Sequence, residues 1–288
     1  MEERIESNRG SVGVGPSWVT GHRSRTRLTV LARTTMTCPL PPEILDLIVD
    51  NLHDKRTALL ACCVVSKSWI PRTRRHIFAH VKFNRSRFPV ESWTKVFPDP
   101  SNSPAHYTQS LTFLNVQLVT PIGQDVVRWV SAFHNVVRLR VGTRDLDRDC
   151  QISFVPLRGL SPAVRSLHLD STYPQHSEVF GLLCSFPLLE DFTLEAFRCW
   201  NGADEWETPL TSPTLSGSLE LCSVIGGIGL ITRRLLDLPS GPNFTNIVLA
   251  CVYEADFKAT TDLVSGCSGT IESLDVADYL PGVSLLDR

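Results

Sequence analysis

A repeated pattern of short apolar segments occupies the chain from about residue 105 to its end. Seven segments each have two apolar residues separated by one other residue, and successive segments start 25 to 28 residues apart. Alternation of this kind predicts a strand with one buried face. Unrelated strands would also alternate, but they would not keep a near-constant spacing. The period therefore predicts a solenoid in which each unit buries its apolar face on the next. The first apolar residues of the segments are Leu111, Leu139, Leu167, Phe192, Leu219, Ile247 and Leu274.

The segments between these strands indicate what kind of solenoid this is. Helix-like segments occupy residues 123–133, 176–186 and 256–267. Strand, helix and turn at this period resemble leucine-rich repeats. The family usually has Asn or Cys three residues after the second core position, and this chain has instead Arg144, Thr172, Phe197, Val224, Val252 and Tyr279. The resemblance implies an α/β solenoid of degenerate repeats over residues 105–288. No obvious polar cap follows the last strand, so a C-terminally truncated solenoid is compatible with the sequence.

The polar residues of the predicted strands give the candidates for substrate binding. Side chains alternate between the two faces of a strand, so the outward residues of neighbouring strands share one surface. This surface grades from basic near residue 138 to acidic toward the C-terminus. The substrate-binding candidates on it are Arg138, Arg140, His168, Asp191, Thr193, Glu220 and Asp275. The alternative is that these side chains belong to solvated strand faces without a ligand.

Residues 38–81 predict three short helices packed into a small apolar unit. Pro41 and Pro42 can start the first helix, because a missing N–H costs nothing in a first turn. Residues 58–65 are apolar nearly all round, so a helix there must be covered on more than one side. Only about 44 residues are available to cover it, and a partner surface is therefore implied.

This stretch resembles an F-box, the adaptor-binding module of cullin–RING ubiquitin ligases. The matching positions are Leu40-Pro41, Glu43, Ile44-Leu45, Ile48, Leu52, Leu59-Leu60 and the run from Val65 to Trp69. One departure is Ser66, where the family usually has Cys. The resemblance implies an F-box over residues 37–82, a linker over 83–104, and docking on the Skp adaptor. The implied contact residues are Leu40, Pro41, Ile44, Leu45, Ile48, Leu52, Leu59, Leu60, Val65 and Trp69. An ordinary helical hairpin core is the alternative.

Composition limits the other classes of function. Residues 1–36 are rich in Gly, Ser, Thr and Arg, and are either a disordered basic tail or precede a translation start at Met36. Residues 150–288 carry seven Lys and Arg against seventeen Asp and Glu, which argues against general nucleic-acid binding. The longest apolar runs are far below the ~20 residues of a membrane span. Nine scattered cysteines without a metal-ligand spacing predict reduced thiols in the cytoplasm or nucleus.

No catalytic constellation is evident in the sequence. Gly226, Gly227 and Gly229 suggest a dinucleotide loop, but Thr232 stands where the third glycine belongs, so a turn between repeats explains them better. We therefore expect a non-enzymatic α+β protein without cofactor or metal. Its expected role is that of a substrate receptor that ties a substrate protein, through Skp, to a cullin–RING ligase. The alternative is an interaction scaffold not coupled to ubiquitination.

Overall fold

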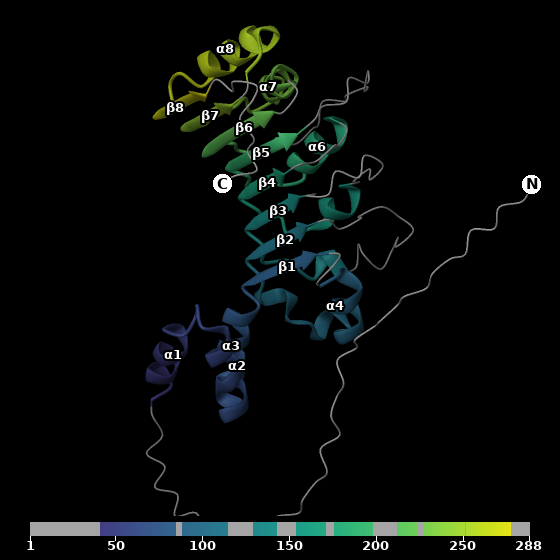
Figure 1. Cartoon of the computed structure of the whole chain (residues 1–288), viewed down its shortest axis with the longest axis vertical. Coiled ribbons are helices and arrows are strands. Elements are labelled where there is room, and N and C mark those ends of the chain that lie inside the picture. Colours follow the sequence, from purple (N-terminus) through teal and green to yellow (C-terminus); the bar gives the residue numbers. More distant parts are fainter. Residues whose placement is uncertain are drawn as a thin grey trace, which may run out of the picture. The chain divides into compact units, whose positions relative to one another are not determined.

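The fold is described from a computed structural model of the chain (Figure 1). The described residues are 41–84, 88–114, 129–142, 154–170, 176–197, 212–223, 227–250 and 252–277. The predicted tail at 1–36, the C-terminal end of the solenoid and the contact residue Leu40 lie outside these ranges, as does most of the helix predicted at 123–133.

The dominant element is an eight-stranded parallel sheet whose strands follow one another in sequence order, so the chain is α+β with a solenoid-like arrangement (Figure 1). Side chains of the strands alternate between a buried and a polar face, and the predicted core residues pair in register, as in Leu139 with Leu167. The period thus specifies the register. The strands are β1 His80–Asn84, β2 Ser110–Leu114, β3 Arg138–Gly142, β4 Ser166–Asp170, β5 Asp191–Phe197, β6 Ser218–Ser223, β7 Asn246–Ala250 and β8 Ser273–Ala277.

The seven predicted strands are all present, as β2 to β8, but the sheet has an eighth strand that was missed, and the prediction of a linker over residues 83–104 is wrong. Strand β1 precedes the predicted array, and its Val81 pairs with Leu111 of β2. The segment after β1 is packed structure, because helix α4 (Val90–Val96) buries Trp93 in the core among aromatic rings that include Phe83 and Phe133. Two 3-10 turns follow, η2 (Pro100–Asn102) and η3 (Pro104–Tyr107).

Helices and 3-10 turns connect the strands, and their apolar residues share one core with the sheet. The predictions at 176–186 and 256–267 are confirmed by α6 (His176–Leu183) and α8 (Phe257–Gly266). Helix α7 (Ile228–Leu236) was not predicted. The remaining turns of this kind are η4 (Val155–Gly159) and η5 (Glu254–Asp256).

The last strand differs from the others because its core-facing side chains are exposed. Leu274 is 46% exposed and Val276 53%, although both pair in register with buried residues of β7. Within the described residues no element covers the outer side of β8.

Three helices precede the sheet, as predicted from the sequence. They are α1 (Pro42–Asp50), α2 (Arg56–Val65) and α3 (Ile70–Ile77), with the 3-10 turn η1 (Lys67–Trp69) between the last two. Val49, Leu59 and Ile77, one from each helix, form their small buried core. Phe78 packs against both this core and the core of the sheet.

Candidate functional site

Helices α1 and α2 expose apolar side chains that a monomer would be expected to bury. Val64 is 87% exposed and Val65 70%. The buried residues of α2 are Leu59 and Cys62, so the other two helices cover little of its apolar surface. Exposed apolar side chains gathered on two short helices are typical of a surface that binds another protein. The large exposed apolar residues of the two helices are Ile44, Leu47, Ile48, Leu60, Val64 and Val65.

The predicted adaptor contacts fall into three groups in the structure. The exposed group comprises Pro41, Ile44, Ile48, Leu60 and Val65. Half-buried residues are Leu45, Leu52 and Trp69. Leu59 is wrong as a contact residue, because it is 1% exposed and contacts Val49 and Ile77 in the core.

Two exposed residues, Leu47 and Val64, were missed by the sequence analysis. Leu47 lies between matched F-box positions and does not itself belong to the quoted pattern. Val64 belongs to a helix that is apolar nearly all round, so the sequence did not show which side of the helix is buried. To predict Leu47 and Val64 as contact residues, one needs to know how exposed each position is in the folded chain.

A polar cluster joins α1 to α3 beside the exposed apolar side chains. The Asp50 carboxylate accepts hydrogen bonds from Arg72 Nε at 2.7 Å and from His76 Nε2 at 2.7 Å, and it also forms an ion pair with Arg72 Nη2. The hydrogen bond from Arg72, followed by that from His76, holds the pKa of Asp50 well below its usual range. This cluster fixes α1 against α3, and so positions Ile44, Leu47 and Ile48.

The predicted substrate-binding residues lie on the polar face of the sheet. Arg140, His168, Thr193 and Glu220 are successive register partners from β3 to β6. We call a set of register partners that crosses the strands a row. Arg138 and Asp191 belong to the row next to this one, because both pair with Ser166. Asp275 belongs to the same row as Glu220, because Val248 pairs with both. All are at least partly exposed, so the structure brings them onto one surface.

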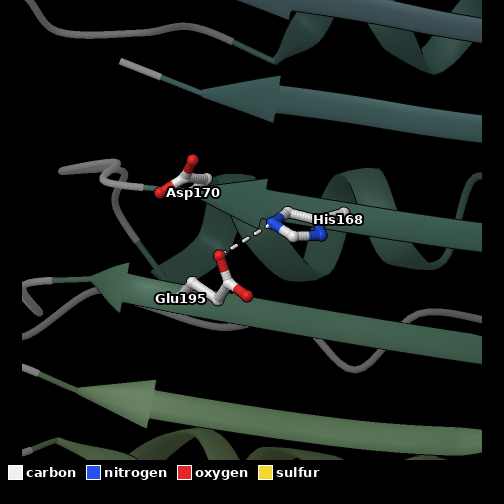
Figure 2. A group of neighbouring side chains, drawn as sticks. All are labelled: His168, Asp170 and Glu195. Atoms are coloured by element: carbon white, nitrogen blue, oxygen red, sulfur yellow. Dashed lines mark hydrogen bonds and ion pairs between the residues drawn. The ribbon is translucent and has the colours of Figure 1, made fainter. Parts of the chain in front are cut away.

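A third row on this face, which includes Asp170 and Glu195, was not predicted, and its carboxylates contact side chains of the first row. Asp170 Oδ2 accepts a hydrogen bond from Arg140 Nη2 at 3.0 Å. Glu195 Oε2 lies 3.2 Å from His168 Nε2. The two side chains point toward each other from neighbouring strands (Figure 2). Asp170 and Glu195 pair in register, and Cys222 follows Glu195 on β6. Strand alternation places these residues on the polar face, so the signal was present one position beyond the strand cores.

A surface hollow of about 340 Å³ lies away from both groups of candidates. Its volume is at the low end of the range for ligand pockets, ~300–1,000 Å³. None of the predicted site residues lines it. The lining residues are Asp99, Pro100, Ser101, His106, Ser131, Ala132 and His134.

Of the glycines near residue 227, Gly227 agrees with its interpretation as a turn residue, whereas Gly229 lies in the first turn of α7 and Gly226 lies outside the described residues. Gly227 has a φ of 94°, which favours glycine, and it immediately precedes α7. Gly229 N–H donates to Asp256 Oδ1 at 2.9 Å, and a Cβ at Gly229 would lie 2.5 Å from that oxygen. The close approach of α7 to η5 therefore requires the glycine at position 229.

The cysteines of the described residues are free thiols, as predicted: Cys62, Cys63, Cys184, Cys222 and Cys267. Burial raises the pKa of the Cys184 thiol to about 11, so at neutral pH this thiol is protonated and a poor nucleophile. Cys267 is likewise buried, with its pKa raised by the same cause.

Comparison with protein-family models, characterised proteins and solved structures returns no match for this chain. Among the described residues, no helix has the length and apolar character that crossing a membrane requires.

Proposed function

We propose that this protein is the substrate-recognition subunit of an SCF-type cullin–RING ubiquitin ligase. In this proposal, α1 and α2 bind the Skp adaptor, and the polar face of the sheet binds a substrate protein. The chain performs no catalysis; it supplies proximity and orientation for a ubiquitin-conjugating enzyme. The proposal rests on the resemblance of residues 38–81 to an F-box, and the observation that supports it is the exposed apolar surface of α1 and α2.

The energetics of this surface favour a protein partner. Burying one Leu, Ile or Val side chain contributes on the order of 1.5–3 kcal/mol before the costs of association are subtracted. A partner that covers the six exposed side chains of α1 and α2 together would therefore gain a large apolar contribution to binding. A protein without such a partner would leave this surface in water, where it promotes aggregation.

Pull-down with purified Skp adaptor tests the proposal. The double variant Ile48→Asp, Val64→Asp places one charge on each helix at exposed positions, so the three-helix core formed by Val49, Leu59 and Ile77 stays intact. We expect this variant to lose adaptor binding by at least about 100-fold, because each carboxylate would be desolvated in the interface.

The matched control is Val96→Asp, which introduces the same charge at an exposed apolar position of α4. It should bind the adaptor like the wild type. If the wild-type protein itself fails to bind the adaptor, or the double variant binds equally well, the docking role is rejected. The protein would then be better described as an interaction scaffold outside ubiquitination.

A further inference from the structure

His168, Asp170 and Glu195 form a compact group of metal-ligating side chains on the polar face of the sheet (Figure 2). One ligand atom of each residue lies within 4.8 Å of the other two. All three residues are half-buried, so water reaches the group without fully solvating it. The proposed adaptor docking uses none of them.

Backbone geometry sets the spacing of these side chains. His168 and Asp170 are two residues apart on β4, so they share a face. Asp170 pairs in register with Glu195 on β5, and neighbouring strands are about 4.8 Å apart. A zinc ion would need each ligand atom at ~2.0–2.2 Å, and the ligand atoms of His168 and Glu195 are already 3.2 Å apart. The parallel sheet thus positions the group without the help of a loop.

The ligand types indicate which ion would bind. An imidazole nitrogen suits zinc and neighbouring transition metals, and carboxylate oxygens are also common zinc ligands. Mg²⁺ and Ca²⁺ prefer oxygen ligands throughout. We propose that His168, Asp170 and Glu195 bind a divalent transition-metal cation, with Zn²⁺ the best fit. Three protein ligands leave one tetrahedral position for water or for a side chain of a bound protein.

Arg140 affects this group in two opposing ways. Its guanidinium holds the Asp170 carboxylate at 3.0 Å and so fixes the orientation of a ligand, as outer-shell partners of metal sites do. Its positive charge also offsets part of the attraction that the two carboxylates exert on a cation. With a neutral imidazole the four side chains carry one net negative charge, which a divalent ion would convert to one positive charge.

The competing explanation is that the four side chains form two ion pairs and bind no metal. Arg140 would neutralise Asp170, and a protonated His168 would neutralise Glu195 across 3.2 Å. Both explanations fit the same distances. They differ in what added Zn²⁺ does, so zinc titration separates them.

The test uses the full chain after bound metal has been removed. The protein is titrated with ZnCl₂ as the only added metal, and a chromophoric chelator that competes for Zn²⁺ reports the binding. Cysteine thiols elsewhere in the chain also bind Zn²⁺, so the proposed site is detected as a difference in binding between the wild type and the variants. At Zn²⁺ concentrations that fill the proposed site, we expect the wild type to bind one more Zn²⁺ per chain than His168→Gln or Glu195→Gln does. Each substitution should weaken that site by at least about tenfold, because even outer-shell changes cost 10–100-fold.

Two control variants separate coordination from weaker effects. Glu220→Gln removes the same charge from a residue of the same face on β6, so it reports general electrostatic attraction. Cys222→Ser removes the thiol that pairs in register with Glu195. Both should bind Zn²⁺ like the wild type. Equal binding by the wild type, His168→Gln and Glu195→Gln would overturn the proposal in favour of the ion pairs.

A second measurement needs no variant of the site and is therefore independent of folding defects. Nitrogen NMR of histidine-labelled wild-type protein distinguishes a metal-bound imidazole nitrogen from a free or protonated one. Zn²⁺ should shift one ring nitrogen of His168 strongly at one equivalent. A His168 signal that does not respond to Zn²⁺ would also reject the site. Adaptor binding is unaffected by either result, so this proposal and the proposed function fail separately.

Discussion

Asp50 has the largest electrostatic role among the described side chains that connect the three N-terminal helices. It ends α1 and bonds to Arg72 and His76 of α3. A carboxylate bonded in this way loses its proton more readily in the folded than in the unfolded chain, because both partners favour the charged form. The side chain is 35% exposed, so solvent screens the pair and its contribution is modest.

Replacing Asp50 with Asn should destabilise the protein in a pH-dependent manner. The lowered pKa means that the contribution of Asp50 is complete above the usual Asp pKa of about 3.9 and is lost as the pH falls toward the folded-state value. We expect Asp50→Asn to cost up to about 1 kcal/mol at pH 5–7, and this difference from the wild type to shrink below about pH 4. Denaturant unfolding at several pH values measures it.

Asp46→Asn is the control for this experiment. Asp46 lies 3.9 Å from Arg72 Nη1 and is more exposed than Asp50, so its loss should change stability little. A cost of Asp50→Asn that stayed constant down to about pH 3 would contradict the argument, because the loss would then arise from packing rather than from the charge.

At the scale of elements, the sequence predicted strands better than helices. Residue pairs such as Leu167 and Leu169 recur at a fixed spacing, and the same alternation defines which side of each strand is buried. Strand β1 was not predicted, because it follows α3 directly and because its Val81 precedes the paired Leu111 of β2 by 30 residues. The other strands repeat every 25–28 residues. Helix α7 was not predicted, because the glycines that precede it are typical of a loop. Gly227 in fact allows the left-handed backbone conformation from which the helix starts.

The contact of α7 with η5 gives a prediction at this scale. In Gly229→Ala, the new Cβ would lie 2.5 Å from Asp256 Oδ1 and 3.1 Å from Asp256 Cα. Asp256 would have to move, and the hydrogen bond from the residue 229 N–H would be lost. We expect a cost of about 1–3 kcal/mol, despite the higher helix propensity of alanine, when the free energy of unfolding is measured.

Gly269→Ala is the matched control, because a Cβ at Gly269 meets nothing within 4 Å among the described residues. It should leave the free energy of unfolding within about 0.5 kcal/mol of the wild type. Equal effects of the two substitutions would show that the close approach of α7 to Asp256 is unimportant for stability.

For the whole molecule, the sequence specified the rows of the sheet but not the contacts between them. The period places Arg140, His168, Thr193 and Glu220 side by side, as the register confirms. Which residues then pair depends on side-chain rotamers, and Arg140 reaches Asp170 in the next row rather than a neighbour in its own. The same limit applies to α2, whose composition could not distinguish the buried Leu59 from the exposed Val64.

Because each unit of the array packs on its neighbours, stability should depend on position along it. Leu167 and Leu274 occupy the same place in their strands, but Leu167 is fully buried between β3 and β5, whereas Leu274 pairs with β7 and is 46% exposed. We expect Leu167→Ala to cost about 2–5 kcal/mol and Leu274→Ala about 1 kcal/mol. Equilibrium unfolding measures both costs.

Hydrogen exchange distinguishes this gradient from a uniform core. Amides of β8 should exchange fastest and those of β3 to β5 slowest, because an end unit has one neighbour and a central unit has two. Leu274→Ala should accelerate exchange in β8 and β7 alone, and Leu167→Ala should accelerate it throughout the sheet. Equal costs for the two substitutions, with even protection along the array, would instead require that something covers β8 in solution. The exposed Leu274 and Val276 would then mark an interface.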